Sequence, residues 1–317
     1  MTIDCDVHTG TPTWEELVPY LDAHWVGVLT ETEFKGPEDR WCFFGSDTRT
    51  DLESVRREVL RDGVEFAVLV CPYAADSIRN PYAAATMAAA VNDWQLAEWL
   101  EPEPRLRGSI VVPSGAPDLA AAEIRRVGGH ASFVQVVVPA RSAVPYGSRE
   151  FLPLFEAAAE LGLAVCIHAG GAPGNPPTSS GWPSYLVEEL AGGAQVFQTQ
   201  LMSLVAEGVL ERFPELKVVC AESGFAWVPP FLWRFDKDWK GLRREIPWVI
   251  RPPSRVIGDQ VRFTTSPLDC PLEALARVAA RLPGDVLLRS SAYPEPAEPL
   301  SAEHDEAFRR AAAGLYR

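Results

Sequence analysis

Short apolar or β-branched runs recur along this chain and alternate with amphipathic, alanine-rich segments. Helical patterns lie between most of the runs, as at Pro81–Leu100, Leu119–Val127 and Glu150–Leu161. This alternation is typical of parallel strands covered by helices. Eight units favour a closed (β/α)8 TIM barrel over an open sheet, formed by one domain of residues 1–317. The predicted strands are Ile3–Val7, Val64–Val70, Ser109–Val112, Phe133–Val138, Val165–His168, Val218–Glu222, Val261–Thr265 and Val286–Arg289.

The composition is that of an ordinary globular protein, with 47% hydrophobic and 23% charged residues. The formal net charge is −14, and the acidic residues are spread out without a long run. Nucleic-acid binding needs clustered Lys and Arg, so we expect no nucleic-acid partner, and no anionic membrane partner. A small-molecule substrate, even an anionic one, remains compatible because local charge in a pocket can oppose the global charge.

The cysteine pattern and the apolar runs bear on location. The six cysteines form no C-x-x-C pair and mostly lie in or beside apolar strand-like runs, as buried thiols do. No secretory segment is evident at the start, and no apolar run approaches transmembrane length. We therefore expect a cytoplasmic protein with reduced thiols.

Two long segments follow predicted strands. The first is an insertion of about 35 residues after the first strand. It contains Gly36, Trp41, Phe43 and Phe44. The second runs over residues 170–184 and is rich in Gly, Pro and Ser. Both begin at the carboxyl end of a strand, which is the catalytic face of barrel enzymes, so we expect them to border the active site.

The first strand ends in a pattern suited to metal binding. Side chains alternate along a strand, so Asp4, Asp6 and His8 are predicted to share the face toward the barrel axis. A carboxylate and an imidazole two residues apart can bind one divalent ion such as Zn²⁺. The alternative is a polar barrel mouth in which Asp6 only orients His8.

Two further strands end in residues that can carry chemistry. His168 closes the fifth strand before Gly170 and Gly171. It could be a satisfied core histidine, but His8 at the same mouth favours a functional role. Glu222 closes the sixth strand, and a buried carboxylate there needs a metal, an arginine or a substrate proton as its partner. Glu222 is thus the first candidate for a general acid or base.

Substrate-binding candidates are less specific. Arg141 follows the fourth strand and could clamp a carboxylate, or it could be a surface arginine in a loop. Thr265 could donate a hydroxyl hydrogen bond, and Trp182, Tyr185 and Trp227 could stack on a ring. The chain has no glycine-rich nucleotide motif, Walker motif or nucleophile elbow, so nucleotide binding and serine hydrolysis have little support.

Taken together, these segments resemble a known family. From end to end the chain is similar to the amidohydrolase-related group that includes aminocarboxymuconate-semialdehyde decarboxylase and related aromatic-acid decarboxylases. The resemblance implies a (β/α)8 barrel, often a homodimer, with one divalent metal at its mouth. It implies His-x-His on the first strand, His on the fifth, Asp on the eighth, and a proton-handling residue after the sixth. The residues that carry it are 3–8, 164–171, 211–216, 225–230 and 263–265.

The chain departs from this pattern at the metal site. His8 and His168 match the family positions, whereas Gly10 replaces the second histidine of the first strand. The eighth-strand motif Ser-Asp-Tyr-Pro-His becomes residues 291–295, with Ala292 for the acid and Glu295 for the histidine. His8 and His168 with Asp6 or Glu222 can still reach the three ligands of a catalytic zinc. We expect weaker metal binding and impaired water activation.

Three functions remain open. The first is an altered enzyme, a hydrolase, decarboxylase or cyclising dehydratase of a small aromatic or acyl compound, with Glu222 as proton carrier and metal dependence impaired or lost. The second is a catalytically degenerate barrel that acts as a binding module or pairs with an active paralogue. The third is a fully metal-dependent hydrolase in which Glu295 or Asp269 supplies the missing ligand. We expect a homodimer, or a hetero-oligomer in the second case.

Overall fold

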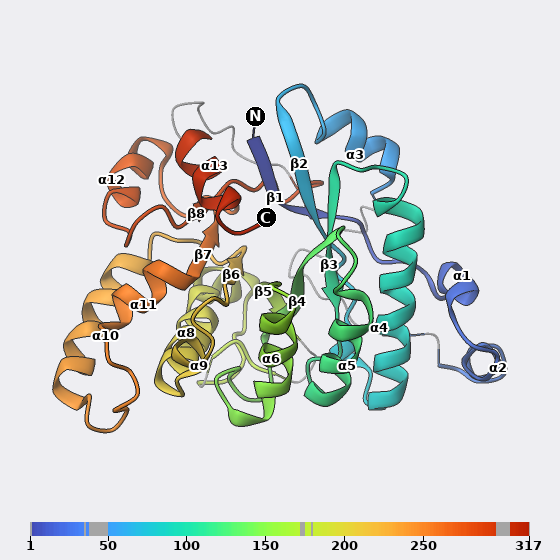
Figure 1. The fold of residues 1–317 in the computed structure, drawn as a ribbon, viewed down its shortest axis with the longest axis horizontal. Helices are drawn as coiled ribbons and strands as arrows, with labels where there is room; N and C mark the ends of the chain where they lie inside the picture. The colour runs from blue at the N-terminus through green and yellow to red at the C-terminus, as the bar shows by residue number, and fades with distance from the viewer. Residues whose placement is uncertain are drawn as a thin grey trace.

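The computed structural model describes residues 2–34, 36–37, 50–171, 175–178, 180–295 and 305–316. Within these residues, eight parallel strands lie in chain order and form a nearly closed barrel with helices around it (Figure 1). The fold is therefore the predicted (β/α)8 barrel. The strands are β1 Thr2–His8, β2 Val64–Val70, β3 Leu106–Val111, β4 Phe133–Arg141, β5 Ala164–Gly171, β6 Val218–Ala221, β7 Val261–Thr264 and β8 Leu287–Leu288.

Helices connect and cover the strands. Several begin with a capping residue that accepts a backbone hydrogen bond, such as Asn80 before α4. The predicted helix over residues 81–100 is α4 followed by a π-helical turn at Leu96–Leu100. The α-helices are α1 Trp14–Leu17, α2 Ala23–Glu31, α3 Leu52–Glu58, α4 Pro81–Gln95, α5 Pro117–Val127, α6 Leu152–Glu160, α7 Leu186–Gly192, α8 Ala194–Ala206, α9 Val209–Arg212, α10 Val228–Leu242, α11 Pro253–Gln260, α12 Leu275–Ala279 and α13 Asp305–Ala313.

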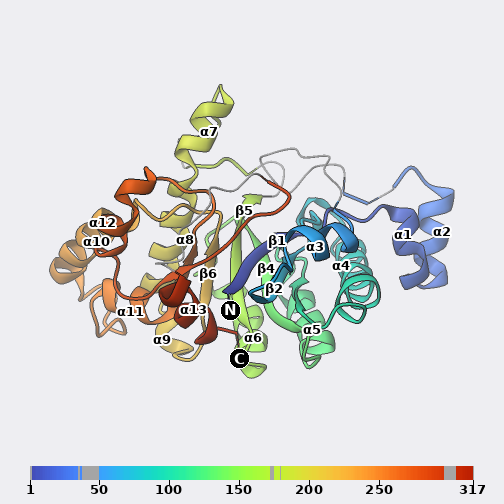
Figure 2. The ribbon, with the colours of Figure 1, turned by 90° about the horizontal axis from the view of Figure 1, so that it is seen from above.

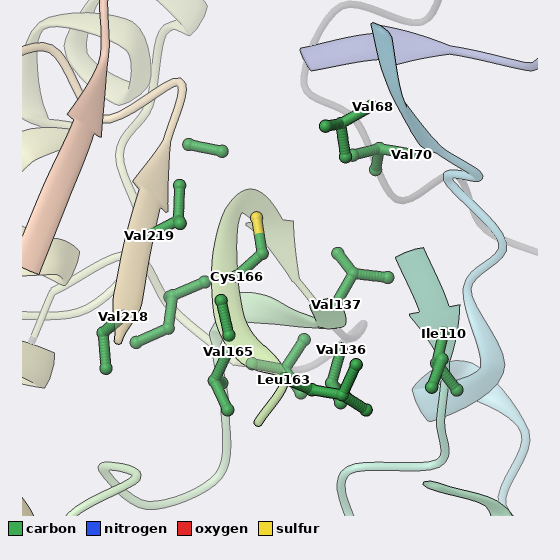
Figure 3. Packing of buried hydrophobic residues seen from close by; sticks show 14 of the residues in the cluster. Val68, Val70, Ile110, Val136, Val137, Leu163, Val165, Cys166, Val218 and Val219 are labelled. Carbon is green, nitrogen blue, oxygen red and sulfur yellow. The ribbon is translucent and has the colours of Figure 1, made fainter. Parts of the chain in front are cut away.

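The strands are buried on both faces, as their continuous apolar sequences require. All eight residues of β5 are buried. Figure 3 shows Cys166 of β5 among branched side chains of the neighbouring strands, including Val137 and Val219. This packed interior fixes the strands relative to one another, so the residues at their carboxyl ends are held in defined positions.

The barrel closes through backbone hydrogen bonds between β1 and the segment after β8. Cys5 N donates to Arg289 O at 2.9 Å, and Ala292 N donates to Asp6 O at 3.0 Å. The carboxylate of Asp4 accepts from the Ser291 amide at 2.9 Å. The segment that carries Ala292 is therefore held directly against the strand that carries Asp6 and His8.

A buried polar network lies inside the barrel. The Tyr316 hydroxyl donates to Gln135 Oε1 at 2.8 Å, and Gln135 Nε2 donates to Ser109 Oγ at 2.8 Å. Ser109 in turn donates to Leu69 O at 2.7 Å. Helix α13, which precedes Tyr316, packs against β1 and β8. Tyr316 thus joins a chain of hydrogen bonds that crosses β4, β3 and β2.

The long segments after β1 and β5 lie partly outside the described residues. Trp41, Phe43 and Phe44 belong to residues 38–49, which the structure does not describe. The second segment leads into α7, which stands away from the barrel at the top of Figure 2. Among the described helices, none has both the length and the apolar character needed to cross a membrane.

We expect Tyr316→Phe to destabilise the protein. The substitution removes the donor to Gln135 and leaves a buried acceptor unsatisfied, at a cost of about 1–3 kcal/mol in the free energy of unfolding. Urea denaturation followed by circular dichroism measures this. Tyr82→Phe is the matched control because Tyr82 is exposed on α4. Equal unfolding midpoints for the two variants would contradict the role given to this network.

Candidate active site

Four side chains from three strand ends meet at the carboxyl end of the barrel. Asp6 and His8 come from β1, His168 from β5, and Glu222 follows β6 directly. One ligand atom from each lies within 4.8 Å of all the others. Asp6 and His168 are fully buried, while the side chains of His8 and Glu222 are about one-tenth exposed. The structure therefore brings together the four residues that the sequence singled out for metal binding and catalysis.

Three of these atoms have the spacing of ligands around one metal ion. His8 Nε2 lies 3.3 Å from His168 Nε2. Asp6 Oδ1 lies 3.4 Å from His8 Nε2 and 3.5 Å from His168 Nε2. Ligand atoms 2.0–2.1 Å from a tetrahedral ion lie about 3.3–3.4 Å from one another. The triangle formed by Asp6, His8 and His168 therefore fits one divalent ion.

The carboxylate of Asp6 is the strongest sign of such a site. Both of its oxygens are buried, and neither makes a geometrically sound hydrogen bond within the described part of the chain. A buried carboxylate left in this state is costly, and a cation between the carboxylate and the imidazoles removes that cost. Glu222 Oε1 lies 3.6 Å from His8 Nε2, so it can join the ligands or act on a molecule bound beside them.

The ring of His168 is oriented as a metal-ligating imidazole usually is. Its Nδ1 lies 2.9 Å from the carbonyl oxygen of Ala169, which can only accept, so Nδ1 carries the proton. Nε2, which faces Asp6 and His8, is then free of a proton in the neutral ring. A backbone carbonyl on the far nitrogen is a common way to fix the ligating tautomer.

The four groups also shift one another's protonation. Burial alone would raise the pKa of Asp6, but the charge of His168 lowers it below its usual value. Burial opposes a charged His168, yet Asp6 and Glu222 raise its pKa to about 9, and they raise the pKa of His8 as well. Burial raises the pKa of Glu222, although both imidazoles act against it. Protons and a metal ion thus compete for the same nitrogens.

Backbone strain marks two strand ends at the site. In the described residues, Glu222 (φ 55°) and Ala292 (φ 51°) are the non-glycine residues with positive φ. The left-handed conformation costs a residue with a Cβ roughly 1 kcal/mol. The Glu222 amide donates to Thr264 Oγ1 at 2.8 Å, and the Ala292 amide donates to Asp6 O. These bonds hold both residues in the strained conformation beside the cluster.

A cavity of about 220 Å³ adjoins the cluster. Glu222 is the cluster residue that lines it, and Pro267 contributes from the segment after β7. Its other walls come from the ends of β4 and β5 and from helices α7 and α8. They are mainly apolar, and they include Ala140, Arg141, Ala169, Gly170, Glu189, Leu190, Gly193, Val196 and Phe197.

Three predicted substrate-binding residues lie toward α7. Arg141 lines the cavity, and its Nη1 donates to Glu189 Oε1 at 3.1 Å. The guanidinium carbon of Arg141 lies 5.8 Å from the ring centre of Trp182, which is mostly exposed. Tyr185 is also exposed, and its amide donates to Glu188 at the start of α7. Arg141 therefore lines the cavity, whereas Trp182 and Tyr185 are not among its lining residues.

Two other predicted residues make structural contacts. Trp227 donates from Nε1 to Ser223 O at 2.9 Å and packs edge-on against Phe263. The hydroxyl of Thr265, itself buried, accepts from the Ser290 amide at 3.1 Å. These residues support the strand ends that carry the site.

The two acids weighed as substitute ligands lie outside the four-residue cluster. Asp269 accepts from the amides of Phe225 and Ala226, each at 3.0 Å, just before α10. The Glu295 amide donates to the carbonyl oxygen of Ala292 at 2.9 Å. Gly10 lies beyond the end of β1 with a positive φ, and it has no side chain that could bind a metal. From this part of the chain, Asp6 and His8 belong to the cluster.

The residues of the cavity's outer wall were not identified from the sequence. Glu189, Val196 and Phe197 belong to α7 and α8, two helices that precede β6. No motif marks them. The signal available was the length of the segment between the fifth and sixth strands, which leaves room for an additional helix over the barrel mouth.

Comparison with known proteins places this geometry in a family. The amidohydrolase family model matches residues 3–313. The chain belongs to the amidohydrolase family.

The chain is similar to several decarboxylases. Gamma-resorcylate decarboxylase of Polaromonas sp. strain JS666 is 29% identical over 232 residues, covering 68% of this chain and 69% of the relative. The fold is similar to that of 5-carboxyvanillate decarboxylase from Sphingomonas paucimobilis, with a TM-score of 0.75, 21% identity, and 100% and 98% of the two chains covered.

A further solved structure contains a metal. Dihydroxybenzoic acid decarboxylase from Polaromonas sp. JS666 was crystallised with manganese and the inhibitor 2-nitroresorcinol. It has a TM-score of 0.68 and 20% identity to this chain, with 99% and 96% of the two chains covered. At these identities the structural likeness establishes the fold.

We expect Ala292→Asp to strengthen metal binding by at least tenfold. The substitution adds a carboxylate at the position where the sequence resemblance implies one, and Asp tolerates the left-handed backbone better than most residues. Titration calorimetry of the metal-free protein with Mn²⁺ or Zn²⁺ measures the affinity. Ala292→Asn is the control because it has the same shape without the charge. If both variants bind as the wild type does, residue 292 does not face the ion.

Proposed function

We propose that this protein is a metal-dependent decarboxylase of a single-ring aromatic carboxylate, with Glu222 as its proton carrier. One observation carries the proposal: Glu222 belongs both to the cluster of possible metal ligands and to the wall of the apolar cavity. A molecule in that cavity would contact the cluster through Glu222. The similarity to gamma-resorcylate decarboxylase supports the choice of reaction.

Asp6, His8 and His168 would hold the metal. Their mixed oxygen and nitrogen donors suit Mn²⁺ as well as Zn²⁺, and manganese is present in the related decarboxylase described above. A bound divalent ion would supply Lewis-acid polarisation of the substrate's oxygen atoms. Without the acid at position 292, we propose that this site binds its ion more weakly than a site with four protein ligands.

The cavity limits the size of the substrate. A cavity of about 150 Å³ is enough to bind benzene. A volume of about 220 Å³ therefore suits one aromatic ring with small substituents. The side chains of Val196, Phe197 and Leu190 offer the apolar contacts that such a ring needs.

The proton step falls to Glu222. In decarboxylation the carbon–carbon bond to the carboxylate breaks, its electron pair stays on the ring carbon, and that carbon takes up a proton as CO₂ leaves. Burial favours the protonated form of Glu222, which can therefore donate the proton from the cavity wall. The carboxylate left behind regains a proton from water. Ala292 cannot share this task because it has no ionisable group.

The reaction is tested with the purified protein loaded with Mn²⁺ or Zn²⁺ and a panel of hydroxybenzoates. We expect release of CO₂ and, in D₂O, one deuterium on the ring carbon that lost the carboxylate. The same preparations are assayed with aryl esters, lactones and anilides. Hydrolysis without decarboxylation would replace the proposed reaction by a hydrolytic one. Tight binding of benzoates without any turnover would indicate that the protein is a binding module and not an enzyme.

We expect Glu222→Gln to lower kcat by about 10²–10⁴-fold, the contribution of a positioned general acid. The metal content should stay near that of the wild type because Asp6, His8 and His168 are unchanged. Elemental analysis and the CO₂ assay are run on the same samples. Glu207→Gln, at an exposed position after α8, is the control. A Glu222→Gln variant with wild-type kcat would remove Glu222 from the mechanism.

Two expectations about the protein's state follow from its sequence and from the resemblance noted there. We propose that the chain forms a homodimer and is cytoplasmic. Light scattering coupled to size-exclusion chromatography tests the first expectation. If the mass is that of one chain, the site must be complete within a monomer. If a paralogue is required for turnover, the hetero-oligomer becomes the functional unit.

A further inference from the structure

The guanidinium of Arg141 lies where the cavity meets α7. Its side chain is only 13% exposed, and its partner Glu189 is 21% exposed, so the ion pair between them is partly withdrawn from water. The ring of Trp182 lies on one side of the same guanidinium. Both charged groups line the cavity that Glu222 also lines. The cavity is thus lined by a cation, Arg141, and an anion, Glu189, and both lie outside the four-residue cluster.

Helix α7 is weakly attached to the barrel. None of its residues is buried, and Leu186 and Val187 expose 59% and 70% of their surface. The helix projects from the barrel in Figure 2. An amphipathic helix normally buries an apolar face to remain in place. The pair between Glu189 and Arg141 is therefore an important link between α7 and the strand ends.

We propose that Arg141 determines specificity for a substrate with a second acidic group, and that Glu189 occupies Arg141 until this group displaces it. The proposal deepens the proposed function and rests on its single-ring aromatic substrate. The reacting carboxylate would lie at the metal cluster and the second acid at Arg141. Glu189 would act as a latch that keeps α7 over the cavity in the absence of substrate.

The strand register supports a ligand of this length. Pro139 of β4 pairs with His168 of β5, and Arg141 pairs with Gly171. The ladder is irregular between these two pairs, and Arg141 begins two residues along β4, or about 7 Å, beyond Pro139, the partner of His168. Two carboxylates on one benzene ring can span a comparable distance. Arg also forms paired hydrogen bonds with a carboxylate, so an aromatic diacid matches both ends of the cavity.

The exchange of partners follows from electrostatics. A partly desolvated guanidinium needs an anion, and Glu189 meets this need in the protein itself. A second carboxylate of the substrate would take the same position, and Glu189 on the exposed α7 could then return to water. Glu189 is thus a competitor of the substrate as well as a support of Arg141. Removing its charge should strengthen binding of the diacid.

The test measures binding of isophthalate, terephthalate and benzoate to the metal-loaded protein, by calorimetry and by tryptophan fluorescence. We expect the tighter of the two diacids to bind at least tenfold more strongly than benzoate. Arg141→Gln should reduce this ratio to about one. Glu189→Gln should raise diacid affinity about tenfold and leave benzoate unchanged. The fluorescence of Trp182 beside Arg141 should respond to the diacid in the wild type.

Matched variants separate these effects from general changes of charge. Glu207→Gln removes the same charge from an exposed position after α8, and Arg149→Gln removes an exposed cation; neither should alter the diacid-to-benzoate ratio. A Glu189→Gln variant that binds the diacid no better than the wild type would overturn the latch. An Arg141→Gln variant that keeps the wild-type ratio would overturn the specificity role.

The test is independent of turnover because it uses acids as ligands and records equilibrium binding. If the diacid preference follows Arg141 but no benzoate is decarboxylated, the proposed reaction fails and this inference stands. If hydroxybenzoates with one acid are decarboxylated and the diacid preference is absent, the proposed reaction stands and this inference fails. Amide hydrogen exchange over residues 186–192 gives a further readout. It should accelerate in Glu189→Gln and not in Glu207→Gln.

Discussion

The carboxylate of Asp6 is fully buried at the end of β1, and a charge in that position is stable only where opposite charge meets it. His8 and His168 converge on it from two strands, at distances that one metal ion would also span. Much of the surrounding structure holds this arrangement. The Ala169 carbonyl fixes the ring of His168, and the backbone bonds between β1 and the segment after β8 hold Asp6 and Ala292 side by side.

The barrel connects this cluster to a second charged pair. The parallel strands end at one face, so Glu222 after β6 and Arg141 at the end of β4 both line the same apolar cavity. Glu222 faces the metal ligands, and Arg141 faces Glu189 on α7. In the proposed mechanism the proton step falls to Glu222, because Ala292 in the segment after β8 has no ionisable group. In our proposal, Arg141 at the end of β4 then selects the ligand of the same cavity.

The barrel could be predicted from the sequence because each strand is a short apolar run followed by a helical pattern. The four cluster residues could be predicted as well, since each closes a predicted strand and strand ends of a parallel barrel meet. Glu189 could not, because its role depends on how α7 lies over the mouth, and no local pattern encodes that position. Thr265 and Trp227 were expected to bind substrate; the structure shows their polar atoms bonded to the Ser290 amide and the Ser223 carbonyl, which only three-dimensional pairing reveals.

The central claim is that Asp6, His8 and His168 form a metal site without an acid at position 292. Elemental analysis tests it most directly, on protein purified without chelator or metal-affinity resin. Wild type, His168→Ala and the control His24→Ala, at an exposed position on α2, are compared. We predict close to one divalent ion per chain in the wild type and the control, and loss of that ion in His168→Ala. Equal metal content in all three preparations, or none in the wild type even after incubation with Mn²⁺ or Zn²⁺, would contradict it.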